Sequence, residues 1–388
     1  MTVGMETREL TKLSFEMGPS RPPSEAQSLL LRIARGCPWH RCEFCSSHRG
    51  KKLQIRRVED IKRDIETARA IADSIREMAW RRGLGGDIRR MAASIYESPP
   101  SDGWRIVALW LFFGGERVFL QDADALIMRT AQLADVLRFL KQTLPSVTRV
   151  TSYARSKTAS MKSVEELTEL HGAGLTRLHI GLESGADEVL DYVCKGVTAA
   201  EHVDGGRKAV QSGISLCEYV MPGLGGRRWK KEHPRETARV LNEINPDFIR
   251  LRSLAIREDI PLYGKYASGD FQLLSDDEVV EEIAEMIQRL EVTSYLASDH
   301  IENLLQEVDG QLPQDKEKML GFINRYLAMP DEERLNFRLG RRMGYYVDLE
   351  DFNSPHKRER IDQMLGGMRS RGEDIEEVIL NLKKRFLV

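Results

Sequence analysis

Strand-like and helix-like segments alternate through the middle of this 388-residue chain. The helix-like segments separate six strand-like runs, at residues 28–36, 117–122, 148–154, 177–185, 214–223 and 247–254. Alternation this regular predicts a parallel sheet with helices outside it, either an open doubly wound sheet or a barrel. In both architectures ligands bind at the carboxyl ends of the strands. Functional residues are therefore expected in the segments that follow the strands.

Periodic apolar residues and capping signals mark the helices. From Val58 to Ile75, apolar residues recur every three or four positions, which predicts a long amphipathic helix. A second helix presents one apolar face, made of Leu133, Val136, Leu137 and Leu140. Two capping boxes predict helix starts: Ser163 with Glu166, and Ser275 with Glu278. The glycines of "FFGGE" (112–116) predict a helix stop.

The same pattern divides the chain into three parts. Residues 1–27 form a lead-in, residues 28–260 carry the alternation, and residues 261–388 lack it. The last part is charged and short of strand signals, so we expect a C-terminal helical domain of more than 100 residues. A helical insertion is expected at about 81–113, where glycines, arginines and "SPPSDG" interrupt the alternation.

Composition narrows the class of protein. A hydrophobic content of 41% and a charged content of 30% are typical of a globular chain. A net charge of −2 gives no general attraction to nucleic acid, which is not an expected partner. The longest apolar run, 106–113, is too short to span a bilayer, and the first residues do not form a signal peptide. We predict a cytoplasmic protein without membrane contact.

Three of the five cysteines, Cys37, Cys42 and Cys45, lie within nine positions directly after the first strand-like run. A zinc site could use them with a nearby histidine, His40 or His48, although no second ligand pair follows. A [2Fe–2S] centre also uses the spacing C-x4-C-x2-C but needs a fourth thiolate. A [4Fe–4S] cluster held by three thiolates leaves one iron open to a ligand.

The remaining two cysteines do not supply an obvious fourth ligand. Cys194 comes 149 residues after Cys45, in a different β/α step, and Cys217 follows later still. Both stand among apolar neighbours, so we expect buried, inert thiols. Five cysteines are also too few for a disulfide scaffold in a chain of this length.

The cysteine segment, with Phe44 before its last cysteine, resembles the cluster loop of radical S-adenosylmethionine (radical SAM) enzymes. The usual family spacing is C-x3-C-x2-C, and this chain has one more residue between Cys37 and Cys42. Residues 178–214, which contain "GLESG", resemble the fourth β/α segment of a group that includes oxygen-independent coproporphyrinogen oxidase, methylthiotransferases and Elp3-like proteins. "YVMPGLGG" (219–226) resembles that group's glycine-rich turn after the fifth strand.

This resemblance, over about residues 28–260, implies an α/β fold: a partial (β/α)6 TIM-like barrel with a C-terminal helical extension. It implies two cofactors, a [4Fe–4S] cluster and S-adenosylmethionine (SAM). The implied activity is reductive cleavage of SAM to a 5′-deoxyadenosyl radical, which abstracts hydrogen from a small-molecule substrate. An external electron donor such as flavodoxin or ferredoxin is also implied.

The resemblance assigns roles to residues that follow the strands. The cluster ligands are Cys37, Cys42 and Cys45, and Phe44 flanks the adenine unless it only packs. The remaining expected SAM contacts are Asp122 and Asp124 for the amino group, Ser152 and Arg155 after the third strand, Glu183 and Ser184 after the fourth, Lys195, and the glycines Gly223 and Gly225. Arg155 or Lys195 would pair with the methionine carboxylate. Glu183 has an alternative role as a helix cap.

Two C-terminal segments are candidates for substrate contact. We expect "SDHIENLL" (298–305) to be helical, with Asp299 and His300 able to bind substrate or move a proton, unless His300 is a structural helix-end residue. "LGRRMGYY" (339–346) suits either an anionic substrate or ordinary packing. The alternative function is a non-catalytic zinc-binding α/β adaptor protein.

Overall fold

The computed structural model describes residues 12–19 and 21–385, with side chains to Lys383. The described chain divides into two compact units. Unit 1 contains the residues up to His40, together with Ser47–Ile180 and Lys208–Ser215. Unit 2 contains Arg41–Ser46, Gly181–Arg207 and the chain from Leu216 onward. The predicted division at residues 27 and 260 stays a prediction.

Eight strands follow one another in the sheet order β1-β4-β5-β6-β7-β8-β9-β10. Their bounds are β1 Leu29–Arg32, β4 Arg117–Gln121, β5 Arg149–Ala154, β6 Arg177–Glu183, β7 Ser215–Val220, β8 Phe248–Leu251, β9 Tyr295–Ala297 and β10 Gly310–Gln311. Neighbouring strands are consecutive in this sheet, whereas a doubly wound sheet reverses its order in the middle. The order is therefore that of a TIM-like barrel, and the predicted α/β class with a mainly parallel sheet is confirmed.

Within unit 1, β1, β4, β5 and β6 pair in parallel. The helices of this unit are α2 Val58–Arg81, α3 Ile88–Glu97, α4 Asp102–Phe112, α5 Thr130–Thr143, α6 Ser156–Ser160 and α7 Val164–Ala173, with short 3-10 turns at Pro23–Glu25 and Ala125–Ile127. The apolar positions expected on α2 from Ile61 to Ile75 are buried, as are those of α5. The helical insertion is present as α3 and α4.

The capping signals behave as expected. Ser163 begins α7 and Ser275 begins α12 (Asp276–Arg289), each with a reciprocal bond to the glutamate three residues later. Gly114 and Gly115 follow α4 with φ angles of 101° and 70°, which confirms the helix stop.

Within unit 2, β7 pairs in parallel with β8, and β8 pairs in parallel with β9. β10 completes the sheet by antiparallel pairing with β9. The C-terminal part, predicted to be helical, also contains these two strands, which are three and two residues long and too short to show an alternating pattern. This part adds β9 in parallel beside the last predicted strand.

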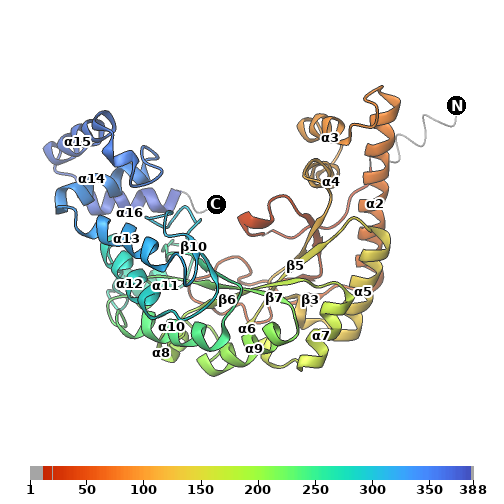
Figure 1. Ribbon diagram of the computed structural model, residues 1–388, viewed down its shortest axis with the longest axis horizontal. Coiled ribbons are helices and arrows are strands. Elements are labelled where there is room, and N and C mark those ends of the chain that lie inside the picture. The colour runs from red at the N-terminus through yellow and green to blue at the C-terminus, as the bar shows by residue number, and fades with distance from the viewer. Residues whose placement is uncertain (1–11, 20, 386–388) are drawn as a thin grey trace. The chain divides into compact units, whose positions relative to one another are not determined.

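The remaining helices are α8 Asp187–Tyr192, α9 Ala199–Gln211, α10 Glu232–Ile244, α11 Leu262–Ala267, α13 Lys316–Leu327, α14 Asp331–Arg342, α15 Pro355–Ser370 and α16 Ile375–Arg385, with a 3-10 turn at Asp351–Asn353. Figure 1 shows α14, α15 and α16 together in the blue C-terminal part, where each contacts the other two. No helix in the described part of the chain is long and apolar enough to cross a membrane.

A buried ion cluster joins three of these C-terminal helices. Asp276 at the start of α12 accepts from Arg342 of α14 at 3.1 Å and from Lys383 of α16 at 2.8 Å. Burial alone would raise the pKa of Asp276, but the two cations hold it below its ordinary value. The carboxylate is therefore ionised, and it neutralises charge that would otherwise be buried without a partner.

We expect Asp276→Asn to lower the free energy of unfolding by about 3–5 kcal/mol, because it leaves Arg342 and Lys383 buried without a counter-charge. Guanidinium chloride unfolding of the anaerobically purified protein measures this change. Asp331→Asn is the matched control, because its side chain is 92% exposed and its pair with Arg334 contributes at most about 1 kcal/mol. Equal losses in the two variants would contradict the prediction.

Candidate functional site

A two-stranded ribbon closes the cysteine segment at its base. β2 (Ala34–Arg35) pairs antiparallel with β3 (Gln54–Ile55), so residues 36–53 form a loop directly after β1. Gly36 begins this loop with a φ of 85°. A β-carbon at Gly36 would lie 3.3 Å from the carbonyl oxygens of Lys51 and Lys52, so the two ends of the loop meet main chain to main chain.

Asp122, which follows β4, holds this base in place. Its Oδ2 accepts from both Nε and Nη2 of Arg32, at 3.1 and 2.7 Å, and from the Gly36 amide at 3.2 Å. Its Oδ1 is buried and has no hydrogen-bond partner among the described residues. Asp122 is a predicted SAM contact. Its Oδ2 is thus occupied by hydrogen bonds at the base of the loop, whereas its Oδ1 is a buried acceptor.

The lead-in segment adds a second brace to the loop. Glu16 accepts from Arg32 at 3.0 Å and from Arg35 at 2.6 and 2.5 Å, and it pairs with Arg56 at 3.2 Å. The Arg35 hydrogen bond, with charges from the other arginines, lowers the pKa of Glu16. Arg56 also donates to Asp64 on α2 at 2.6 Å. A single carboxylate therefore binds arginines before and after the loop: Arg32 in β1, Arg35 in β2, and Arg56 directly after β3.

The loop carries three half-buried thiols that form no disulfide: Cys37, Cys42 and Cys45. Cys37 belongs to unit 1, whereas the other two belong to unit 2. Within the described ranges, no three His, Cys, Asp or Glu side chains are gathered as a metal site. The donor set nevertheless fits an iron–sulfur cluster, because thiolates are the usual protein ligands of such clusters.

Glu43, between two of these cysteines, anchors the second half of the loop within unit 2. Its amide donates to Val193 O at 2.9 Å, and its carbonyl accepts from the Leu262 amide at 3.0 Å. Its carboxylate pairs with Lys265 of α11 at 2.8 Å. Cys194 lies next to it, with Sγ 3.7 Å from Glu43 Oε1. Cys194 is exposed, so the expectation of a buried thiol is wrong for it, whereas Cys217 is buried as expected.

In unit 1, three predicted SAM contacts lie after β4 and on or after β5. Burial raises the pKa of Asp124 to about 6. Thr158 and Arg155 act in the opposite direction and lower this pKa. The Thr158 hydroxyl donates to Asp124 Oδ2 at 2.5 Å. The Arg155 guanidinium lies 5.4 Å from the ring centre of Trp39 in the cysteine loop. Ser152 is buried within β5 and donates to the Tyr153 carbonyl at 2.8 Å.

In unit 2, Phe44, Glu183 and Lys195 lie together. Glu183 ends β6 with a φ of 62°, and its Oε1 is 3.0 Å from Lys195 Nζ. The same ammonium lies 5.4 Å from the ring centre of Phe44. A β-carbon at Gly181 would lie 2.2 Å from Glu183 Oε1, so only glycine allows this carboxylate to fold back over its strand.

Glu218, on β7, belongs to the same group and was not predicted from the sequence. It is fully buried, and neither carboxylate oxygen has a hydrogen-bond partner among the described residues. Burial raises the pKa of Glu218 well above its ordinary value, Lys195 lowers it and Glu183 raises it further. The signal in the sequence was one acidic residue inside the otherwise apolar strand "ISLCEYV". An unpartnered buried carboxyl of this kind suits a polar ligand.

Ser184 is engaged in a buried network instead of facing a ligand. His233 of α10 contacts Met221 O through Nε2 at 3.1 Å and Ser184 Oγ through Nδ1 at 2.8 Å. A carbonyl only accepts, so Nε2 carries the proton and the serine hydroxyl donates to Nδ1. Burial lowers the pKa of His233 to about 4, which keeps the ring neutral. One histidine thus joins the turn after β6 to the turn after β7.

Glu282 of α12 holds the second turn from the other side. Its Oε1 accepts from the Gly223 amide at 2.6 Å and lies 3.5 Å from His233 Nε2. Burial raises the pKa of Glu282 to about 8. Because the imidazole is also neutral, the 3.5 Å approach is a contact between uncharged groups and not an ion pair. A β-carbon at Gly225 would lie 2.9 Å from His233 Cβ, so this glycine is needed for packing.

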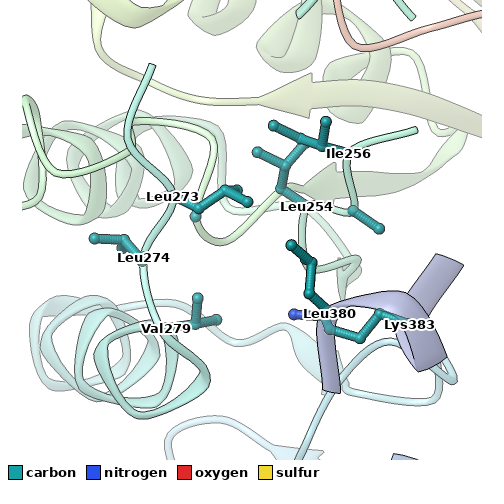
Figure 2. Close-up of a pocket in the computed structure, with 9 residues that line it drawn as sticks. Leu254, Ile256, Leu273, Leu274, Val279, Leu380 and Lys383 are labelled. Atoms are coloured by element: carbon teal, nitrogen blue, oxygen red, sulfur yellow. The ribbon is translucent and has the colours of Figure 1, made fainter. Parts of the chain in front are cut away.

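An apolar cavity of about 30 Å³ lies in unit 2, where the chain leaves β7 and β8. Figure 2 shows Leu254 and Ile256, which follow β8, facing Leu380 and Lys383 of α16 across it. The Lys383 ammonium is already bound to Asp276. The cavity thus offers apolar contacts and no free cation among its lining residues.

The predicted helix at 298–305 is absent, and the segment is a loop after β9. Asp299 pairs with Arg250 of β8, and His300 is half-buried. In the 339–346 segment, Arg341 and Arg342 donate to the carbonyls of Leu304 and Glu302 at 3.0 Å each, and Tyr346 is fully buried. That segment therefore serves packing, as its alternative interpretation held.

Comparison with known proteins relates part of this chain to a family. A family model described as the Radical SAM superfamily matches residues 102–240. The tRNA uridine(34) acetyltransferase of Methanocaldococcus jannaschii is 21% identical over 121 residues, which are 31% of this chain and 22% of that protein. Its counterpart in Methanocaldococcus infernus is 22% identical over 123 residues, which are 31% of this chain and 23% of that protein. The chain thus spans less than a quarter of the length of these curated relatives.

Solved structures give matches of low similarity. Elp3 of Methanocaldococcus infernus, lacking its N-terminus, matches with a TM-score of 0.40 and 16% identity, covering 54% of each chain. Coproporphyrinogen III oxidase of Escherichia coli, titled a radical SAM enzyme, matches with a TM-score of 0.40 and 15% identity, covering 73% of this chain and 55% of that one. The segment that matches the family model, residues 102–240, contains β4 to β7 with the Glu183–Lys195 pair. That match relates residues 102–240 of the chain to the radical SAM superfamily.

Proposed function

We propose that this protein is a radical SAM enzyme in which Cys37, Cys42 and Cys45 bind a [4Fe–4S] cluster. The observation that carries the proposal is three thiols without a disulfide in a ribbon-closed loop directly after β1. The superfamily uses this cluster together with SAM. Three thiolates leave the fourth iron for a ligand other than the protein.

When bound, the cluster supplies the electron that cleaves SAM to methionine and a 5′-deoxyadenosyl radical, which abstracts hydrogen from the substrate. The protein's own part is to hold the loop, the nucleoside and the amino acid end of SAM. Asp122 and Glu16 fix one end of the loop through Arg32, and Glu43 fixes the cysteines that follow. Each anchor restricts loop motion that would otherwise cost entropy on cluster binding.

The polar residues of unit 2 match a zwitterionic ligand. Lys195 provides a buried cation for the SAM carboxylate, while Glu183 and Glu218 provide acceptors for its amino group or ribose hydroxyls. Phe44 lies close enough to Lys195 to flank the adenine. In unit 1, the free oxygens of Asp122 and Asp124 and the Arg155 guanidinium remain proposed contacts.

Two turns in unit 2 would surround the nucleoside, and the Ser184–His233–Glu282 network fixes both. Its members are buried, so they act by positioning the main chain around Glu183 and Gly223 and not by touching SAM. The proposed substrate is a small molecule, and the proposed electron donor is an external protein such as flavodoxin or ferredoxin.

Serine substitution of Cys37, Cys42 or Cys45 is expected to abolish cluster binding, because each change removes one of three thiolate ligands. Iron and sulfide analysis of anaerobically purified protein measures the cluster, with about four of each expected per wild-type chain. Chemical reduction in the presence of SAM should give 5′-deoxyadenosine from the wild type and none from these variants.

Cys194→Ser and Cys217→Ser are the matched controls and should keep both iron and 5′-deoxyadenosine formation. A colourless wild-type protein holding one zinc would instead support the adaptor alternative. Loss of the cluster in Cys194→Ser would show a fourth thiolate on the metal and would overturn the proposal.

Glu282→Gln tests the buried network through pH. The folded pKa of Glu282 is about 8, above the ordinary 4.5, so between these values only the unfolded chain releases this proton. The contribution of Glu282 to the free energy of unfolding is fully present below pH 4.5. It falls by about 1.4 kcal/mol per pH unit between pH 4.5 and pH 8. Glutamine keeps an acceptor for Gly223 and never ionises, so the variant should lack this loss.

Urea unfolding of wild type and Glu282→Gln at several pH values measures the effect. His233, with a folded pKa of about 4 against 6.5, acts in the opposite direction below pH 6.5 but is present in both proteins. The difference between the two proteins should therefore grow steadily in favour of the variant up to pH 8. A difference independent of pH would show that Glu282 is ionised throughout.

A further inference from the structure

Two arginines extend from the carboxyl end of β8 on one face of unit 2. Ile249 and Leu251 are fully buried, and side chains alternate along a strand, so Arg250 and Arg252 extend from the other face. Tyr219 of β7 lies directly beside Arg250 in the parallel register. The Arg252 guanidinium lies 4.6 Å from the ring centre of Tyr219. The carboxyl ends of β7 and β8 therefore share a cationic, aromatic surface.

The loop after β9 is fixed against the same end of β8. Asn303 accepts from the amide and the hydroxyl of Ser253, at 3.0 and 2.9 Å, and donates to the Leu251 carbonyl at 2.8 Å. These three buried bonds hold the loop to the last residue of β8, Leu251, and to Ser253 just beyond it. Asp299 and His300 are thereby held beside the two arginines, since β9 runs parallel to β8.

The charges of the two arginines, Asp299 and His300 do not cancel. Asp299 binds Arg250 as its ion-pair partner. For Arg252, no carboxylate partner is found among the described residues, and its guanidinium contacts the ring and the hydroxyl of the uncharged Tyr219. Burial, with a further contribution from the charge of Arg252, lowers the pKa of His300 to about 4, so the histidine is neutral. One positive charge on a partly buried guanidinium is left without compensation.

His300 adds a neutral hydrogen-bond donor. Its Nδ1 accepts from the Glu302 amide at 3.3 Å, so in the neutral ring Nε2 carries the proton. A neutral imidazole with a fixed N–H donates a hydrogen bond without repelling the neighbouring guanidinium. Arginine and a ring N–H together form a set of donors with a single excess positive charge, which is complementary to an oxyanion.

We propose that Arg252, with Arg250 and His300, binds an oxyanion group of the substrate, a carboxylate or a phosphate. The inference rests on the proposed function, because the site follows the strands whose ends would receive the substrate. A guanidinium recognises either group through two parallel N–H donors. The apolar cavity between Leu254 and Leu380 does not compete for this role, because its lysine is already paired with Asp276.

The first experiment uses the cluster-containing wild-type protein saturated with SAM, so that the SAM site is filled. Inorganic phosphate and acetate are titrated separately by calorimetry. Saturable binding of phosphate alone identifies a phosphate site, binding of acetate alone identifies a carboxylate site, and binding of both identifies a general oxyanion site. Binding of neither overturns the proposal.

Variants then assign the bound anion to Arg252. Arg252→Gln should weaken binding about tenfold or more, the loss expected for one charge-assisted hydrogen bond. Arg252→Lys keeps the charge and should recover part of the affinity. Arg239→Gln is the matched control, because Arg239 lies on the outer helix α10 with Glu236 and Glu243 as its partners. Equal affinity in wild type and Arg252→Gln overturns the assignment.

An experiment on the wild-type protein does not require any variant to fold. An arginine-specific dicarbonyl reagent should label Arg252, and the bound anion should protect it while Arg239 stays reactive. Absence of protection contradicts the proposal. Formation of 5′-deoxyadenosine by the same preparation tests the proposed function separately, so anion binding and radical chemistry can fail independently.

Discussion

Parallel pairing of strands in chain order is the constraint on which the functional regions of this protein depend. Each connection returns the chain to start the next strand at the same edge, so the segments after the strands collect at the opposite edge. In unit 1 these segments supply Asp122 and Arg155. In unit 2 they supply Gly223, Arg252 and His300, the last because β9 continues the parallel series.

Burial without a counter-charge decides the protonation of the polar residues around these strand ends. Asp276 faces two cations and stays ionised, although it is as buried as Glu282. Glu282 faces only an amide and a neutral imidazole, so it keeps its proton near neutral pH. The same rule makes His233 a neutral link between two turns. Charge is retained in the interior only where an opposite charge is within reach.

The cysteine loop shows how a long connection can be fixed at its first end and again near its middle. Its first end is held by Asp122 and Glu16 through arginines, and the stretch between Cys42 and Cys45 is held by Glu43. The hydrogen bonds at Glu43 use the main chain as well as the carboxylate, which fixes the backbone and not only one side chain.

The sequence by itself determined the strand series, the long helices and the cysteine loop, because hydrophobic periodicity, capping residues and cysteine spacing are local patterns. Only the tertiary structure decided what surrounds Ser184, Glu218 and Arg252. Ser184 is occupied by a histidine 49 residues away, and Glu218 is significant because burial leaves it without a partner. The loop at 298–305 has a helix-like pattern, yet bonds from Asn303 to the end of β8 hold it as a loop. Long-range hydrogen bonds and burial depend on which segments meet in space, and no local pattern records that.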